Sequence, residues 1–447
     1  MTLREHLRAN ISLALPVMLS QLGHVTMGVM DNVMIGRVGA TPLAGASLAN
    51  VIFNVLMLFG IGVSYAITPL IAEADGKQNK DGIVSVFRHG LLINVCLSFI
   101  LILLVILGKN LLYQIDQPVE AVEEALPYLS IITFSLLPIL IFQTFRQFAD
   151  GLSLTYLSLV IMIAANVLNI ILNYTFIYGN FGFEAMGLQG AGYATLTSRI
   201  FMAIALAVYV FYHHRLKIYR GIFSLGAYSK KTFNTLLHIG VPAGMQFIFE
   251  VAAFDFSAVM MGWLGTNTLA AHQIAINLAT ISYMTTSGLG AAAVIRIGNY
   301  IGKNDYKNVK ASAYSLIGMA LVIMLVWGIV FLIGRYWFPA LYINNAEVIK
   351  IAGPLLIIAG FFQLSDGMQV VCAGALRGLQ DVKIPSLYIF ISYWIIGLPL
   401  GYWLAFQSNM GAMGIWLGLL IGLTLVAIAL FARLRSLMNK RALEAEL

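Results

Sequence analysis

Long apolar stretches, separated by short polar connectors, make up almost all of this chain of 447 residues. A bilayer core about 30 Å thick needs about 20 apolar residues per helix, so each long stretch predicts one membrane-spanning helix. Stretches 43–72 and 268–300 are long enough that their helices should tilt or extend beyond the bilayer. We expect an all-α integral membrane protein with twelve transmembrane helices, at approximately 11–35, 43–72, 84–108, 125–147, 156–180, 187–213, 233–262, 268–300, 309–334, 346–376, 384–406 and 412–435.

The composition agrees with a bilayer environment. Hydrophobic residues make up 60% of the chain and charged residues 10%, whereas soluble proteins carry about 25% charged residues. The net charge of +7 is spread over short connectors and forms no basic stripe with interleaved aromatic residues. We therefore expect the lipid bilayer as a partner and no nucleic acid.

The two halves of the chain repeat one pattern at an offset of 226 residues. Matches include Pro16 with Pro242, Gly62 with Gly288, and Gly76-Lys77 with Gly302-Lys303. The longest clearly polar connector lies between the halves. We predict an N-terminal six-helix bundle at 1–215, a cytoplasmic linker at 216–231 and a C-terminal six-helix bundle at 232–447. Six spans return the chain to the same side, so a pseudo-twofold axis along the membrane normal should relate the bundles, with a central cavity between them.

The distribution of Lys and Arg predicts the orientation. The termini and the connectors on their side hold 21 of the 26 basic residues, the opposite side holds four, and Arg199 falls within a span. Because positive charge marks the cytoplasmic side, both termini should be cytoplasmic. We expect a multi-pass monomer in a bacterial cytoplasmic (inner) membrane.

Three carboxylates interrupt the apolar spans: Asp31, Glu250 and Asp366. A charge at the bilayer centre costs at least about 2.5 kcal/mol on insertion scales, so such residues mark paths for ions, protons or substrates. Glu250 aligns in the repeat with His24, which places an ionisable group at the same depth in both halves. Asp255 follows Glu250 by five residues and points about 140° away around the helix, so its role stays open.

Polar side chains in other spans suit Asp31 as partners. Asn169 and Asn173 are four residues apart and share a helical face, and Thr195 lies in the next span. With Asp31 they make a set of oxygen ligands for a cation or a proton-carrying network. The alternative is that they form interhelical hydrogen bonds that only hold the helices together.

Two further polar residues have open roles. His272 is expected to be a satisfied buried polar residue rather than a ligand. Arg199 either pairs with an acid on another helix or extends towards the membrane surface.

Methionine and aromatic residues surround the acids in sequence. Such surfaces suit flat hydrophobic cations, through apolar contact and cation–π attraction, although any single one can instead face lipid or a neighbouring helix. The candidate substrate-binding residues are Gln21, His24, Met27, Phe53, Phe247, Asp255, Phe362 and Gln363.

Signatures of enzymes are missing from the sequence. It has no phosphate-cradling Gly-rich loop that ends in Lys-Ser/Thr, and its His residues lack metalloprotease spacing. We expect a transporter that is not an enzyme, is not driven by ATP and needs no cofactor.

The span 10 motif resembles a known family. The stretch from Gln363-Leu-Ser-Asp366 to Ala375-Leu-Arg377-Gly378-Leu-Gln-Asp381 is similar to the multidrug and toxic compound extrusion (MATE) transporters of the NorM branch. Asp31 followed by Asn32-Val-Met-Ile-Gly36, Glu250 in span 7, and Ser392-Tyr-Trp394-Ile-Ile-Gly397-Leu-Pro399 agree with it. The similarity extends over essentially the full chain.

The resemblance implies efflux of amphipathic, mostly cationic drugs, driven by inward flow of Na⁺ or H⁺. The first-half coupling site would then use Asp31, Asn169, Asn173 and Thr195. In the second half Glu250 and Asp366 would bind the coupling ion, and would hold the metal if this ion is Na⁺. Phe362 stands where some sodium-coupled relatives carry a tyrosine, which leaves the choice of ion open.

The expected mechanism is antiport by alternating access, in which organic cation and coupling ion compete for the same carboxylates. The main rival is a flippase for lipid-linked saccharides, whose central cavity would be cationic for an anionic head group. An integral-membrane enzyme or a receptor without transport are alternatives from other classes.

Overall fold

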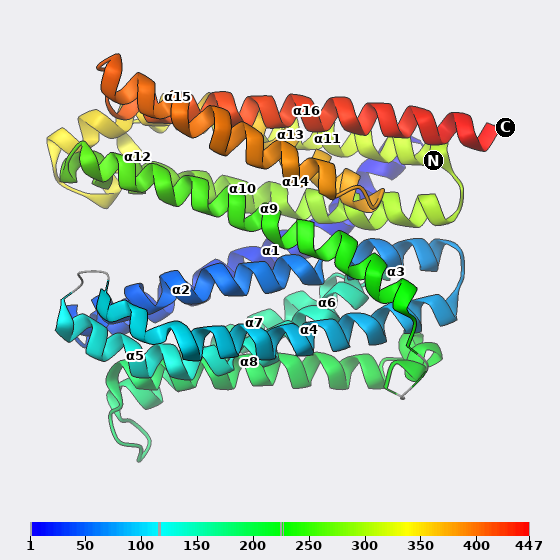
Figure 1. The fold of residues 1–447 in the computed structure, drawn as a ribbon, viewed down its shortest axis with the longest axis horizontal. Coiled ribbons are helices and arrows are strands. Elements are labelled where there is room, and N and C mark those ends of the chain that lie inside the picture. Colours follow the sequence, from blue (N-terminus) through cyan, green and yellow to red (C-terminus); the bar gives the residue numbers. More distant parts are fainter. Residues whose placement is uncertain (1, 115–117, 224–225, 227, 447) are drawn as a thin grey trace. The chain divides into compact units, whose positions relative to one another are not determined.

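The computed structural model describes residues 2–114, 118–223, 226 and 228–446, and nearly all of them are helical (Figure 1). Within these residues twelve helical segments are long and apolar enough to cross a membrane, and no β-strand occurs. The prediction of an all-α protein with twelve spans is therefore confirmed.

Several spans consist of more than one helix. The first half contains α1 (Leu3–Gly36), α2 (Ala40–Ser64) with α3 (Ile67–Gly76), α4 (Lys80–Gly108) with η1 (Lys109–Gln114), α5 (Val119–Phe134) with α6 (Leu136–Gly151), α7 (Tyr156–Tyr178) and α8 (Gly187–Tyr212). The second half contains α9 (Lys230–Trp263), α10 (Thr266–Gly302), α11 (Tyr306–Gly334), α13 (Ala346–Gly378), α14 (Lys383–Phe390) with η3 (Ile391–Gly397), α15 (Leu398–Tyr402) and η4 (Trp403–Gln407), and α16 (Ala412–Glu446). Two short elements, η2 (His214–Phe223) and α12 (Trp337–Tyr342), belong to connectors. Of the predicted linker, residues 224, 225 and 227 lie outside the described residues.

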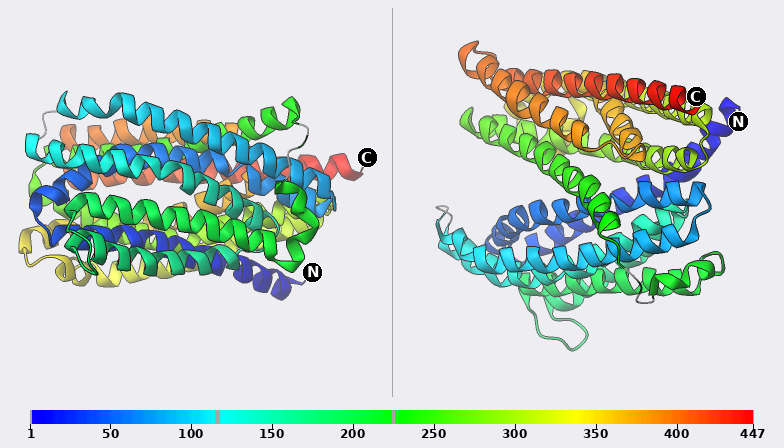
Figure 2. Two further views of the ribbon diagram at one scale, coloured as in Figure 1. Left: turned by 90° about the horizontal axis from the view of Figure 1, so that it is seen from below. Right: turned by 45° about the vertical axis from the view of Figure 1, so that its right-hand side comes forward.

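The chain forms two compact units that divide it at different residues from the predicted bundles. Unit 2 is Leu19–Gly244, and unit 1 is Met1–Met18 together with Met245–Leu447. Thus α1 belongs to unit 1 up to Met18 and to unit 2 from Leu19, and α9 belongs to unit 2 up to Gly244 and to unit 1 from Met245. Both change units two residues after a matched proline, Pro16 or Pro242. Proline removes a helical hydrogen bond and clashes with the preceding turn, so each helix is least regular there. Both termini lie at the same end of unit 1 (Figure 2).

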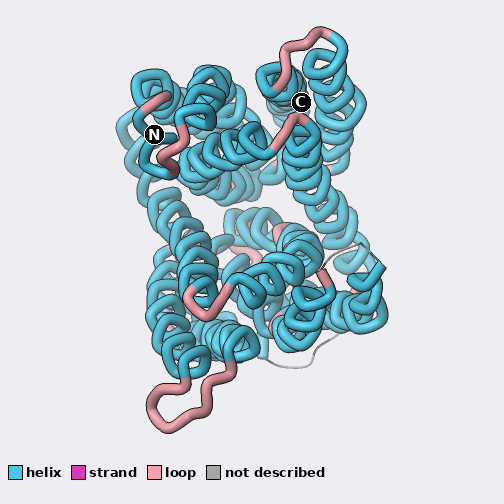
Figure 3. Tube along the Cα trace, turned by 90° about the vertical axis from the view of Figure 1, so that its left-hand side faces the viewer, coloured by secondary structure: helices cyan, strands magenta, loops and turns pink. Residues whose placement is uncertain are grey.

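Loops join the helices (Figure 3), and two of them share the same capping and backbone conformation. Asn79 and Asp305, 226 residues apart, cap α4 and α11. Each side chain accepts a hydrogen bond from the backbone N–H three residues later, at 2.9 Å and 3.1 Å. The residues before them, Gln78 and Asn304, both have left-handed backbones, with φ of 55° and 56°. The repeat seen in the sequence is therefore also a repeat of local conformation, caps included.

Span 11 is less regular than the predicted helix at 384–406. It contains two wide π-helical turns, at Ile391–Gly397 and Trp403–Gln407. Pro399 follows the first of them, and because proline cannot continue the regular hydrogen-bond ladder, the wider turn accommodates it. Trp394 in this turn donates to the backbone oxygen of Phe249, at 2.9 Å.

Glycines allow the closest approach of helix backbones. In unit 2 a Cβ atom added at Gly62 would lie 2.5 Å from the Gly244 Cα. In unit 1 a Cβ added at its repeat partner, Gly288, would lie 3.0 Å from the Met18 backbone nitrogen. Thus α2 packs on the first part of α9, and α10 packs on the first part of α1, through small residues typical of membrane helix contacts.

We expect Gly62→Ala to destabilise the protein by about 1–3 kcal/mol, because the new methyl group overlaps backbone that cannot move aside as a side chain can. The thermal unfolding midpoint of the purified protein in detergent measures this effect. Gly318→Ala is the matched control, since a Cβ there meets nothing within 4 Å and should raise stability slightly through helix propensity. Equal midpoints for both variants would contradict the assignment of Gly62 as a close-contact position.

Candidate functional sites in the two units

The four predicted residues of the first half meet in unit 2. Asn173 Nδ2 donates to Asp31 Oδ1 at 2.5 Å, and Thr195 Oγ1 donates to Asp31 Oδ2 at 3.3 Å. Asn173 Nδ2 also lies 3.2 Å from Asn169 Oδ1. Three helices, α1, α7 and α8, supply these groups, so the tertiary fold produces the cluster that the spacings indicated.

Arg199, whose partner the sequence could not assign, lies one helical turn after Thr195. Its Nη1 donates to Ser135 Oγ at 2.6 Å, and its guanidinium carbon lies 4.9 Å from the centre of the Phe53 ring. The guanidinium interacts electrostatically with Asp31 and Tyr128, but Arg199 and Asp31 form no direct ion pair in the part of the chain that the structure describes. Arg199 is thus buried next to the acid without contacting it.

The other first-half candidates lie on α1 and α2. Met27 and Phe53 are buried, and Gln21 and His24 are partly buried. His24 interacts electrostatically with Arg199 and therefore belongs to the same polar region of unit 2. Of these four residues, Phe53 has the clearest contact with a charged group, through Arg199.

The acids of the second half come together in unit 1. Gln369 Nε2 donates to Glu250 Oε1 at 2.8 Å, and the Tyr393 hydroxyl donates to Gln369 Oε1 at 3.3 Å. Asp366 is 5% exposed and interacts electrostatically with Glu250. Gln363 is fully buried, and neither its side-chain oxygen nor its nitrogen has a hydrogen-bond partner. One helix, α13, therefore brings an acid and two carboxamides to the same part of unit 1 as Glu250.

Aromatic rings pack around this acidic cluster. The Phe362 ring is buried, 6.0 Å from the Phe254 ring and 6.2 Å from the Trp416 ring. Trp416 Nε1 donates to His272 Nδ1 at 3.2 Å, so the prediction that His272 is a satisfied polar residue is confirmed. Phe362 and Gln363, predicted as substrate-binding residues, lie in the interior of this unit.

The last two substrate candidates lie on α9. Asp255 is exposed, in agreement with its expected direction away from Glu250. Phe247 lies under the guanidinium of Arg377, whose carbon is 5.9 Å from the ring centre. Arg377 also interacts electrostatically with Glu250, so the second half contains a basic residue near its acids.

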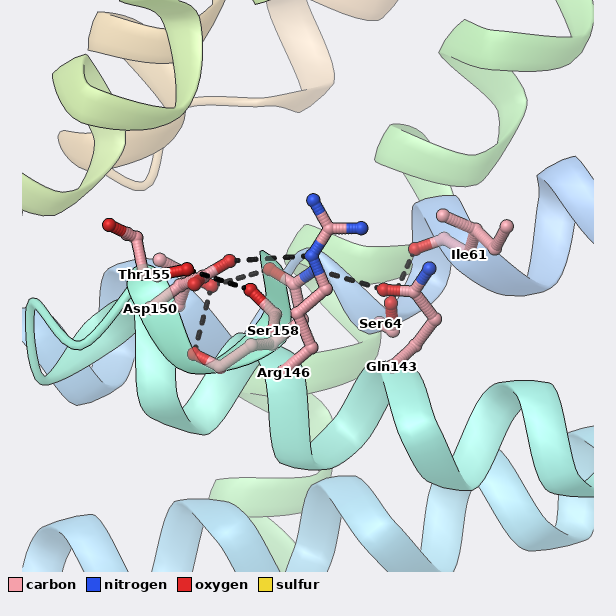
Figure 4. Close-up of polar contacts among 9 residues, drawn as sticks. Ile61, Ser64, Gln143, Arg146, Asp150, Thr155 and Ser158 are labelled. Carbon is pink, nitrogen blue, oxygen red and sulfur yellow. Dashed lines mark hydrogen bonds and ion pairs between the residues drawn. The ribbon is translucent and has the colours of Figure 1, made fainter. Parts of the chain in front are cut away.

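The sequence interpretation missed a buried ion pair in unit 2. Arg146 Nε lies 3.7 Å from Asp150 Oδ2, and both residues are 5% exposed (Figure 4). In Figure 4 Thr155 and Ser158 lie beside the Asp150 carboxylate, and Gln143 lies on the opposite side of Arg146. The spacing of opposite charges at i and i+4 within an apolar span was the signal that could have identified this pair.

Burial also changes the count of basic residues used for orientation. Arg146 and Arg296, at the ends of two predicted spans, are among the 21 basic residues counted on the cytoplasmic side, but both are buried. Arg296 donates to the His6 backbone oxygen at 3.0 Å and to the Tyr300 hydroxyl at 2.9 Å, and so attaches the start of α1 to unit 1. Without these two residues the asymmetry is nineteen to four, so the predicted orientation does not depend on them.

The side chains that could bind a metal ion are of different chemical types. Within the described residues no three His, Cys, Asp or Glu side chains lie close enough together to hold a metal. A cation at Glu250 and Asp366 would therefore need a further oxygen of another type. The unpartnered carboxamide of Gln363 could provide one, since alkali and alkaline-earth cations accept neutral oxygen ligands.

Comparisons with known proteins agree with this architecture. The MatE family model matches residues 16–175 and 242–403, two segments that begin at the paired prolines. The multidrug resistance protein NorM of Photobacterium profundum is 37% identical over 438 residues, which cover 97% of this chain and 96% of that protein.

This chain belongs to the MatE family. The multidrug resistance protein MdtK of Yersinia pseudotuberculosis is 32% identical over 442 residues, which cover 97% of this chain and 96% of that protein. The predicted resemblance to NorM-like MATE proteins is therefore confirmed. The family is one of membrane transporters, not of enzymes, and the bacterial relatives together with twelve spans indicate a multi-pass inner-membrane protein.

Solved MATE structures share the fold. The crystal structure of a MATE protein in the bent conformation has a TM-score of 0.91 and 19% identity, over 100% of both chains. An outward-facing multidrug resistance MATE transporter has a TM-score of 0.88 and 20% identity, over 98% of this chain and 97% of that one. At these identities the comparison concerns the fold alone.

We expect Arg146→Gln to destabilise the protein by about 3–5 kcal/mol, because it leaves the Asp150 carboxylate buried without its counter-charge. The double variant Arg146→Gln with Asp150→Asn removes both charges and should recover most of this loss. Thermal unfolding of purified protein in detergent compares them. The control is Glu444→Gln at the exposed pair with Lys440, which should change stability by less than about 0.5 kcal/mol. A double variant less stable than the single one would contradict the pairing.

Proposed function

We propose that this MatE protein is a secondary antiporter that exports amphipathic, mostly cationic compounds in exchange for Na⁺ or H⁺ by alternating access. The observation that carries the proposal is one acidic cluster in each unit, in which Asp31 and Glu250 are partly buried and Asp366 is buried. Asp31 has Asn173 and Thr195 as donors, and Glu250 lies with Asp366 and Gln369. Carboxylates are retained within membrane-spanning helices mainly for ions, protons and substrates.

Competition for these acids supplies the coupling. A carboxylate that binds a small cation or a proton loses most of its attraction for an organic cation, and the reverse also holds. The membrane potential adds about 2.3 kcal/mol per 100 mV for each net charge that moves inward. Inward flow of the coupling ion can therefore drive outward movement of the drug.

The second-half cluster fits Na⁺ as the coupling ion. Glu250 and Asp366 would bind it, and the Gln363 carboxamide would add a neutral oxygen where Phe362 offers none. Phe362 and Gln363 are assigned to this ion site because they precede Asp366 by four and three residues on α13. Drug contacts are then assigned to the predicted residues Gln21, His24, Met27, Phe53, Phe247 and Asp255.

Orientation and assembly complete the proposal. Both termini are assigned to the cytoplasm by the asymmetry of basic residues. The protein acts as a monomer in the lipid bilayer, since each chain carries both clusters. A flippase for anionic lipid-linked saccharides is disfavoured, because its cavity would need an excess of buried positive charge near the proposed sites.

Flux measurements in proteoliposomes test the proposed antiport. An inward Na⁺ gradient or a pH gradient, imposed separately, should drive ethidium export, and the effective gradient identifies the ion. Asp366→Asn should reduce coupled export at least about a hundredfold while the protein still inserts, because a carboxamide holds no exchangeable charge. Full export by this variant, or turnover of ethidium into another compound, would contradict the antiport.

Equilibrium Na⁺ binding to purified protein tests the ligand set. We expect Gln363→Leu to raise the Na⁺ concentration for half-saturation about tenfold, because the site loses one oxygen. Gln143→Leu, which removes a buried carboxamide of unit 2, is the matched control and should leave Na⁺ binding unchanged. Unchanged binding in Gln363→Leu would assign this side chain to packing only.

A further inference from the structure

We propose that Arg199 is a resident counter-charge for Asp31 that excludes metal cations from the first-half cluster. The inference deepens the proposed function and rests on it, because it assigns any metal coupling ion to the second-half cluster alone. It concerns side chains within unit 2 only.

The position of Arg199 follows from its helix. Thr195 donates to Asp31 Oδ2, and Arg199 is the next residue on the same face of α8. Long side chains in helices lean back towards the N-terminus, so the guanidinium returns towards the level of Thr195. The electrostatic interaction between Arg199 and Asp31 agrees with this placement.

Contacts with two other elements hold the guanidinium in place. Ser135, between α5 and α6, accepts its hydrogen bond at 2.6 Å, and the Phe53 ring of α2 lies 4.9 Å away. Arg199 is 8% exposed, and arginine keeps its charge even when buried. The positive charge is therefore a fixed part of unit 2, in contrast to a bound ion that exchanges.

The contacts of Asp31 are those of an anion that already has its partners. Asn173 and Thr195 direct an N–H and an O–H at its two oxygens. A metal ion bound to Asp31 would need these neighbouring groups to direct oxygen lone pairs towards it, instead of N–H and O–H groups. The other groups near this pair are Tyr128 of α5, which hydrogen-bonds Asn50, and His24 of α1, and none of these three side chains is a carboxylate.

Electrostatic repulsion gives the size of the effect. At an effective dielectric constant of about 20, two positive charges up to about 12 Å apart repel each other enough to weaken binding of the second by about tenfold or more. The second-half cluster differs in its balance of charge, because two acids, Glu250 and Asp366, lie together there near one basic residue, Arg377. The two clusters are therefore predicted to differ in metal affinity although the scaffold is repeated.

Equilibrium binding of ²²Na⁺ to the full-length protein in detergent tests the proposal. The background variant Glu250→Gln with Asp366→Asn removes the second-half acids, so only the Asp31 cluster could bind Na⁺. This background should bind no Na⁺ saturably. Adding Arg199→Gln should create one saturable Na⁺ site per chain, and further addition of Asp31→Asn should abolish it.

The conservative variant Arg199→Lys is the matched control, and it should still exclude Na⁺ because it keeps the charge. The proposal would be overturned if the background variant, with Arg199 intact, bound Na⁺ saturably and Asp31→Asn removed that binding. A folded Arg199→Gln protein that gains no site would overturn it as well. Because these measurements need no drug transport, they remain informative if ethidium export fails.

Discussion

The cost of burying charge in a low-dielectric interior is the constraint on which this structure depends. An uncompensated ion inside a helical bundle costs several kcal/mol, so each buried charge needs an opposite charge or hydrogen-bond donors. Asp31 has Asn173 and Thr195, and Arg146 has Asp150. The helices are thus held in their arrangement partly by the need to bring these partners together.

The repeated scaffold carries different charges in its two halves. His24 and Glu250 are equivalent in the repeat. With one inserted residue in the second half, Asp150 and Arg377 are also equivalent. Each is followed by a matched glycine and, two positions after that glycine, by a residue with a left-handed backbone. A duplicated backbone therefore presents a carboxylate at one position where its copy presents a guanidinium.

The continuity of α1 and α9 matters for the proposed mechanism. Each helix belongs to both compact units, and each changes unit just after a proline. Asp31 and Glu250 lie in the parts after the proline, in the units that hold their hydrogen-bond partners. Any change in the state of either acid therefore acts on a helix that extends into the other unit.

The amino-acid sequence alone determined the class of the protein, the twelve spans and the repeat, because the length of an apolar run and the offset of matched residues can be read from the chain without a fold. The intramembrane acids could also be identified from the sequence, since a charged residue within an apolar stretch is recognised without knowledge of the tertiary structure. Only the tertiary structure decided that Arg199 lies near Asp31 while bonded to Ser135, that Gln363 is buried without a partner, and that Arg146 pairs with Asp150 inside unit 2. Those outcomes depend on how helices rotate and pack against each other, and burial, which decides whether a charge is costly, is a property of that packing.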